Sequence, residues 1–148
     1  MQIITIFVAK FYAKRLKIFT AMEQYHISIY SNFEEFWRYN VVVMASVKRD
    51  GEEIQRLKAK DEVALAGAEL LNPPLGYKAN RIVELDSEPA TELTLYIYIL
   101  PHTFPRTLSI ADTPPFDLRV EVMYGSERRY AHTLEIDQWS GANIILNL

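Results

Sequence analysis

The chain has 148 residues and a formal net charge of −3, with 49% hydrophobic and 24% charged residues. This length and composition are typical of one globular domain. Because the chain has no cysteine, disulfide bonds, thiolate metal sites and cysteine nucleophiles are excluded.

Residues 1–21 are a basic, apolar segment that differs in charge from the rest of the chain. Four of the 16 bases lie there without an acid, so this arm holds +4 and residues 22–148 hold −7. The four bases are Lys10, Lys14, Arg15 and Lys17. Such an arm is a candidate for contact with a membrane surface, through residues 1–19, or with an acidic partner.

Two alternatives remain open for this arm. Ile3–Val8 fits an extra strand of a sheet, and Met22 fits a natural start that makes the arm an extension. The apolar residues precede the bases, which is the reverse of a signal peptide, and the run Ile3–Ala9 is too short to span a membrane. We therefore expect no transmembrane segment, and we favour the cytoplasm.

The first elements after the arm are predicted from periodicity and turn chemistry. Tyr25–Tyr30 alternates with period two, which indicates a strand, and Asn32–Glu35 fits a helical turn. Asn40–Val47 and Glu52–Leu57 flank Asp50-Gly51, the dipeptide typical of a tight hairpin.

The next segment predicts a short helix. Asp61–Leu71 is rich in alanine and leucine, and Asp61 stands where a helix cap is expected. Asn72–Gly76 contains two prolines, which cannot continue a helix.

From residue 79 onward, short apolar runs alternate with turn clusters, which is the pattern of successive antiparallel strands. The expected strands are Ala79–Asp86, Thr91–Leu100, Thr107–Ala111, Phe116–Tyr124, Arg128–Asp137 and Ala142–Leu148. Residues 22–148 therefore predict one all-β domain, an antiparallel β-sandwich of about seven to nine strands with one or two short helices.

Because antiparallel strands send their connections to alternating ends, the predicted strands sort the loops into an acidic and a basic end. The acidic end collects Asp86, Glu88, Asp112, Asp117 and Asp137, beside Phe116 and Trp139. Calcium takes six to eight oxygen ligands, so this end is a candidate calcium site or, with Trp139, a carbohydrate-binding site. The same residue types also build ordinary turns, and that interpretation stays open.

The basic end collects Lys78, Arg106, Arg128 and Arg129, beside Tyr77, His102 and Phe104. Planar guanidinium groups suit a phosphate, a carboxylate or an acidic partner loop, although solvated arginines at a strand start explain the pattern equally. Phe104 and Trp139 are candidate platforms for a sugar or anchors for a protein, or Trp139 plugs the end of the sandwich. We expect His132, within a strand, to face the core.

The chain shows no pattern typical of catalysis. It has no nucleophile elbow, no glycine-rich phosphate loop and no converging histidines, so we expect neither an enzyme nor a cofactor apart from calcium. The acidic body argues against nucleic acid as a partner. We expect a non-catalytic binding module, most simply a protein–protein interaction domain or assembly subunit. Contact between acidic and basic ends would allow self-association.

Overall fold

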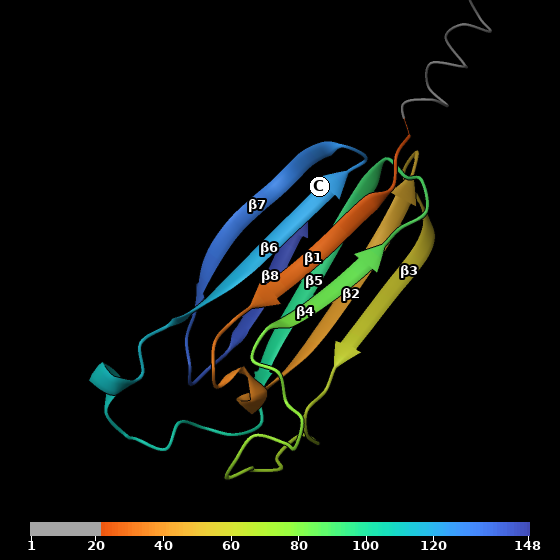
Figure 1. Ribbon diagram of the computed structural model, residues 1–148. Helices are drawn as coiled ribbons and strands as arrows, with labels where there is room; N and C mark the ends of the chain where they lie inside the picture. Colours follow the sequence, from red (N-terminus) through yellow and green to blue (C-terminus); the bar gives the residue numbers. More distant parts are fainter. Residues whose placement is uncertain (1–21) are drawn as a thin grey trace, which may run out of the picture.

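The computed structural model describes residues 22–148, which form one β-sandwich (Figure 1). The expected arm, with Lys10, Lys14, Arg15 and Lys17, lies outside the described residues. The strands are β1 (Tyr25–Ser31), β2 (Tyr39–Arg49), β3 (Glu52–Asp61), β4 (Arg81–Asp86), β5 (Glu92–Pro101), β6 (Phe116–Tyr124), β7 (Glu127–Ile136) and β8 (Ala142–Asn147). Two short 3-10 turns, η1 (Phe36–Arg38) and η2 (Ile110–Asp112), interrupt the loops.

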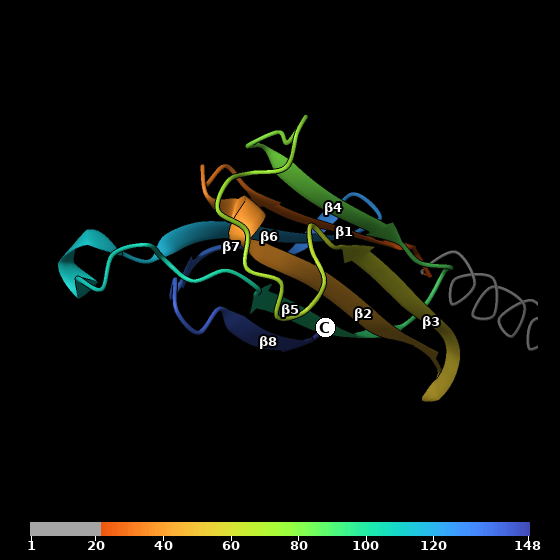
Figure 2. The ribbon, with the colours of Figure 1, turned by 90° about the horizontal axis from the view of Figure 1, so that it is seen from below.

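The strands form two four-stranded antiparallel sheets with the orders β4-β1-β6-β7 and β3-β2-β5-β8. Figure 2 shows the two sheets as separate layers. Alternate residues of each central strand point between the layers; Tyr25, Ile27 and Ile29 of β1 are buried, as are Leu95 and Ile97 of β5. The predicted antiparallel β-sandwich is confirmed, because the period-two alternation that indicated strands is the burial pattern of the sheets.

The two ends of the sandwich differ in the length of their connections. The turn end holds residues 50–51, 87–91 and 125–126, and the loop end holds residues 32–38, 62–80, 102–115 and 137–141. The loop end lies at the lower left of Figure 1. At the turn end, Asp50 and Gly51 have φ angles of 52° and 83°, which confirms the predicted tight hairpin.

Two predicted elements at the loop end are wrong. Residues 62–71 are a loop rather than part of a helix, and residues 107–111 are extended chain and the start of η2 rather than a strand. Gly67, at a φ of +81°, departs from helical backbone in the first segment. In the second, Leu108 and Ile110 are exposed and have no neighbouring strand. A short run that contains apolar residues does not by itself distinguish a strand from a loop.

Smaller differences concern a turn and a histidine. The helical turn expected at Asn32–Glu35 lies slightly later, as η1. His132 is exposed on β7, contrary to the expected core position. Because β7 is an edge strand, its inward side is less completely covered than that of a central strand.

Candidate protein-binding surface

Two loops of the loop end carry most of the strongly exposed large apolar side chains. Residues 62–80 connect β3 to β4, and residues 102–115 connect β5 to β6. Of the nine such side chains in the described part of the chain, six lie in these loops, with exposed fractions from 54% to 106%. We call these six the loop surface: Leu65, Leu71, Leu75, Phe104, Leu108 and Ile110. The two loops are neighbours, since the Leu70 N–H donates to the Thr103 hydroxyl, and exposed apolar side chains concentrated on neighbouring loops are candidates for an interaction site.

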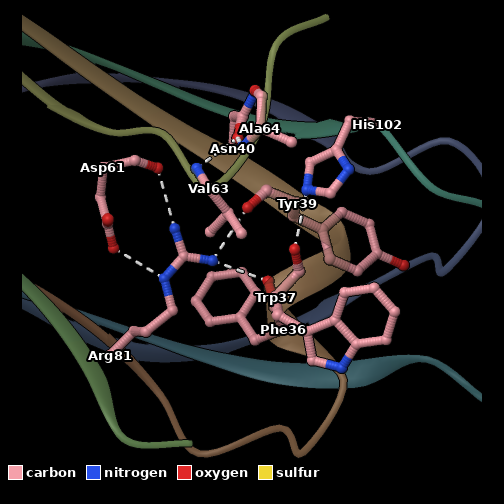
Figure 3. Close-up of polar contacts among 9 residues, drawn as sticks. All are labelled: Phe36, Trp37, Tyr39, Asn40, Asp61, Val63, Ala64, Arg81 and His102. Carbon is pink, nitrogen blue, oxygen red and sulfur yellow. Dashed lines mark hydrogen bonds and ion pairs between the residues drawn. The ribbon is translucent and has the colours of Figure 1, made fainter. Parts of the chain in front are cut away.

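Arg81 fixes the point where the first loop meets β4 (Figure 3). Its buried guanidinium donates to the Asp61 carboxylate at 2.6 Å and to the Asp61 carbonyl at 2.8 Å. It also donates to the carbonyls of Phe36, at 2.6 Å, and Tyr39, at 2.9 Å. Because a guanidinium holds five donors in one plane, this single side chain ties the ends of β3 and β4 to η1.

Asn40 holds the beginning of the same loop. Its Oδ1 accepts hydrogen bonds from the backbone N–H groups of Val63, at 2.8 Å, and Ala64, at 3.3 Å. Its Nδ2 donates to the Ala64 carbonyl at 2.7 Å. The buried Asn40 side chain therefore takes the place of the backbone partners that these groups would have in a helix, and it holds residues 63–64 in a loop.

His102 and Thr103 join the two loops. The Nε2–H of His102 donates to the Trp37 carbonyl at 2.7 Å (Figure 3). The other ring nitrogen, Nδ1, lies 2.8 Å from the Thr103 hydroxyl and 3.2 Å from the Ala68 carbonyl. The Thr103 oxygen in turn accepts from the Leu70 N–H at 2.9 Å. Both side chains are buried, so the loops share a chain of hydrogen bonds shielded from water.

Arg38 and Gln138 attach the remaining connections of the loop end to η1. Arg38 is 1% exposed, and its Nη2 donates to Gln138 Oε1 at 2.6 Å and to Glu35 at 3.0 Å. Gln138 Nε2 donates to the Pro114 carbonyl at 2.7 Å. Buried polar groups of this kind hold the loops in place where they meet the sandwich.

A hollow of about 690 Å³ opens between the second loop and residues 32–35. Glu34, Glu35 and Asp112 line it, together with one base, Arg106. The acids of the loop end are Glu34, Glu35, Glu62, Glu69, Asp112 and Asp137. Its exposed bases are only Lys78 and Arg106, so the surroundings of the loop surface are net negative.

The five carboxylates expected to form a calcium site do not come together. Asp86 and Glu88 lie at the turn end, whereas Asp112 and Asp137 lie at the loop end and Asp117 is the second residue of β6, next to the loop end. The falsely predicted strand at 107–111 reversed the end assigned to every later connection. Within residues 22–148, no group of three or more His, Cys, Asp or Glu side chains suits a metal ion. The calcium and carbohydrate alternatives therefore lose the cluster on which they rested.

Asp137 builds the turn between β7 and β8. Its Oδ1 accepts from the N–H groups of Ser140 and Trp139, each at 2.9 Å, and from the Ser140 hydroxyl at 3.1 Å. The backbone N–H of Ser140, followed by that of Trp139, lowers the pKa of Asp137. This arrangement matches the turn-forming interpretation.

The expected basic end is divided in the same way. Lys78 and Arg106 lie at the loop end, and Arg128 and Arg129 lie at the turn end. Arg129 contacts Glu127 at 3.3 Å, and Arg128 lies 3.8 Å from Glu121. The two arginines are thus partly neutralised at the opposite end from Arg106.

The aromatic candidates have three different environments. Phe116 is a core residue, and Tyr77 is half-buried, with burial raising its pKa. Trp139 is half-buried, stacks on Phe104 with 6.0 Å between ring centroids, and donates from Nε1 to the Thr113 hydroxyl at 3.1 Å. Phe104 remains 54% exposed despite this stack, and it belongs to the loop surface.

Sequence reasoning missed most of the loop surface. Leu65 and Leu71 fell in the expected helix, and Leu108 and Ile110 fell in the expected strand. The available signal was the setting of these residues, between prolines and glycines and without a sustained period, which favours a loop.

Comparison with known proteins identifies no relative. No protein-family model, no curated protein and no solved structure matches the chain. Among the described residues, no helix has the length and apolar character needed to cross a membrane. The geometry of the loop surface is therefore the basis for a functional proposal.

Proposed function

We propose that the chain is a non-catalytic protein-binding module and that a partner protein covers the loop surface. One observation carries this proposal: large apolar side chains are exposed to solvent on loops that buried polar residues hold in place. Leaving Leu65, Leu75 and Leu108 exposed contributes nothing to folding, whereas covering them stabilises a complex. Loops that are anchored at several points also lose less conformational entropy on binding than free loops would.

The charges around the loop surface favour a protein over an anionic membrane. Acids outnumber exposed bases at this end, and anionic lipid headgroups attract Lys and Arg instead. Glu34 and Asp112 line the hollow without an ion-pair partner among the described residues. The complementary partner surface has an apolar centre and basic residues at its rim.

Site-specific photo-crosslinking in the cells that make the protein tests this proposal. A benzophenone amino acid replaces Leu75, Leu108 or, as a control, Ile82, which is 54% exposed on β4. We expect one protein to be cross-linked from both loop positions and not from position 82. The absence of a protein adduct at both loop positions, or the same adduct at all three positions, contradicts the proposal.

A substitution then measures the contribution of the loop surface. Leu75→Asp should weaken binding of the cross-linked partner at least about tenfold, because it places a charge in an apolar contact, while Ile82→Asp should leave binding unchanged. Flotation with phosphatidylcholine vesicles that contain phosphatidylserine provides the competing outcome. Vesicle binding that Leu75→Asp abolishes, without a protein adduct, would replace the protein partner with a lipid surface.

A further inference from the structure

The four edge strands of the sandwich differ in charge. Strands β3, β4 and β7 all carry charged residues: Glu52, Glu53, Arg56, Lys58, Lys60 and Asp61 on β3, Arg81, Glu84 and Asp86 on β4, and Glu127, Arg128, Arg129 and Glu135 on β7. Charges on an edge strand discourage pairing with another chain. β8 has the sequence Ala-Asn-Ile-Ile-Leu-Asn, with no charge and no proline. It is therefore the unprotected edge of the described structure.

The hydrogen bonds of β8 show which backbone groups face the free edge. Leu148 and Leu93 exchange both N–H···O bonds, each at 2.8 Å. In an antiparallel pair, such residues alternate with residues whose N–H and C=O point away from the neighbouring strand. Counting back along the register, Asn143, Ile145 and Asn147 present their N–H and C=O groups away from β5.

We propose that a second copy of this chain covers the edge, with the two β8 strands antiparallel about a two-fold axis at Ile145. In this register, Ile145 pairs with Ile145 of the partner subunit, and Asn143 pairs with Asn147 of the partner subunit. All three residues that face the free edge then gain backbone partners, and the two four-stranded sheets join into one.

The sequence of β8 is self-complementary about Ile145. Asn143 and Asn147 stand two residues to either side, and Ile144 and Leu146 stand one residue to either side. A two-fold axis therefore places amide opposite amide and branched aliphatic opposite branched aliphatic, which is what an isologous interface requires. Because the strand is uncharged, two copies approach without like-charge repulsion.

The pairing also covers apolar surface on both sides of the sheet. Ile144 and Leu146 point toward the core and are only half-buried, because no strand lies beyond β8. Ile145 is 56% exposed on the outer face, where it lies beside Tyr96, which in turn lies beside Met44. A second copy continues this apolar row and shields its exposed end.

The dimer leaves the loop surface free. Because the two β8 strands run antiparallel, the loop ends of the two subunits point in opposite directions. The inference is independent of the proposed partner, and failure of one proposal does not affect the other.

Sedimentation equilibrium of the full chain over a wide range of concentration tests the inference. We expect a reversible species with twice the 17.2 kDa mass of one chain. Ile145→Lys places two ammonium groups against each other at the axis, and it should yield monomer. Ile82→Lys is the matched control, since Ile82 is an isoleucine of similar exposure, 54%, on edge strand β4, and it should remain dimeric. A monomeric wild-type chain, or a dimer that Ile145→Lys does not weaken, overturns the inference.

Mixing two variants tests the position of the axis. Ile145→Lys and Ile145→Glu should each be monomeric, and an equimolar mixture should restore the dimer, because unlike charges then meet at the axis. Circular dichroism of each variant checks that it is folded. Hydrogen exchange gives a second measurement: the amides of Asn143, Ile145 and Asn147 should exchange rapidly in the dilute monomer and slowly in the dimer. A mixture that stays monomeric, or amides equally protected in the monomer, excludes this pairing.

Discussion

The loop end and the turn end of this sandwich join the same strands in opposite ways. At the turn end, a two-residue turn connects β2 to β3 and another connects β6 to β7. At the loop end, residues 62–80 and 102–115 form long connections that bring apolar side chains into water. Buried Arg38, Asn40 and Arg81 hold those connections. Strands of this sandwich can be joined by two-residue turns, so the sandwich itself does not require the long, polar-anchored loops, and the proposed partner gives them a role.

Substituting one arginine at each end should show most strongly that the loop end depends on buried polar contacts and the turn end does not. Arg81→Ala deletes four hydrogen bonds from a buried guanidinium and leaves the carbonyls of Phe36 and Tyr39 without that donor. We expect a loss of about 3–5 kcal/mol in the free energy of unfolding. Arg49 at the turn end donates only to the Pro89 carbonyl from an exposed position, so Arg49→Ala should cost less than about 1 kcal/mol. Urea denaturation measures both, and equal losses would contradict the contrast.

Alkaline pH offers a second test of the loop end. Burial raises the pKa of Tyr39 from 10.0 to about 12, partly opposed by the Arg38 guanidinium. Since the pKa of Tyr39 is higher in the folded state than in the unfolded state, the contribution of its neutral form to the free energy of unfolding is complete below pH 10. This contribution is lost as the pH rises through 12. The loss amounts to about 3 kcal/mol, because each pKa unit corresponds to about 1.4 kcal/mol. Denaturation curves between pH 9 and about 12 measure this loss.

The matched variant separates Tyr39 from the other tyrosines. Tyr39→Phe removes the hydrogen bond to the Gln138 carbonyl and should cost about 1 kcal/mol at neutral pH. It should also make the alkaline decline shallower. A smaller decline should persist, because burial also raises the pKa of Tyr25 and Tyr77. An unchanged slope would show that Tyr39 does not titrate in this way.

The same contrast explains which features the sequence predicts. Strands such as Phe116–Tyr124 were placed correctly, because one side of the sheet is buried and the alternation of Leu118, Val120 and Val122 records this directly. Tight turns such as Asp50-Gly51 were placed correctly because their backbone angles demand particular residues. Both signals are local.

The anchors of the loop end depend on contacts between distant residues. Arg38 meets Gln138 across 100 positions, and Asn40 meets Ala64 across 24. The periodicity of the sequence does not encode such pairs. The predicted helix therefore rested on the helix propensity of its residues, whereas hydrogen bonds to distant residues determine the loop at residues 62–71. This kind of error changed the predicted sites more than the predicted fold. One falsely predicted strand assigned Asp86 and Asp112 to the same end of the sandwich, although they lie at opposite ends. The uncharged β8 was visible in the sequence, but its edge position follows only from the strand order.

A further comparison of the two ends concerns how rigidly the first loop is held. Asn40→Ala removes the acceptor of the Val63 and Ala64 N–H groups, and we expect a loss of about 1–3 kcal/mol. Hydrogen exchange should accelerate at those two amides, while the amides of Ile144 and Leu146, which face β5, stay protected as before. Thr91→Ala is the counterpart at the turn end, where the Thr91 hydroxyl accepts from the Asp50 N–H at 3.0 Å in an exposed position, and it should cost less than about 1 kcal/mol. If Asn40→Ala also weakens the cross-linked partner while Thr91→Ala does not, the anchored conformation of the first loop contributes to binding. If both variants bind equally well, the loop surface does not depend on this anchor, and the exposed leucines themselves determine the affinity.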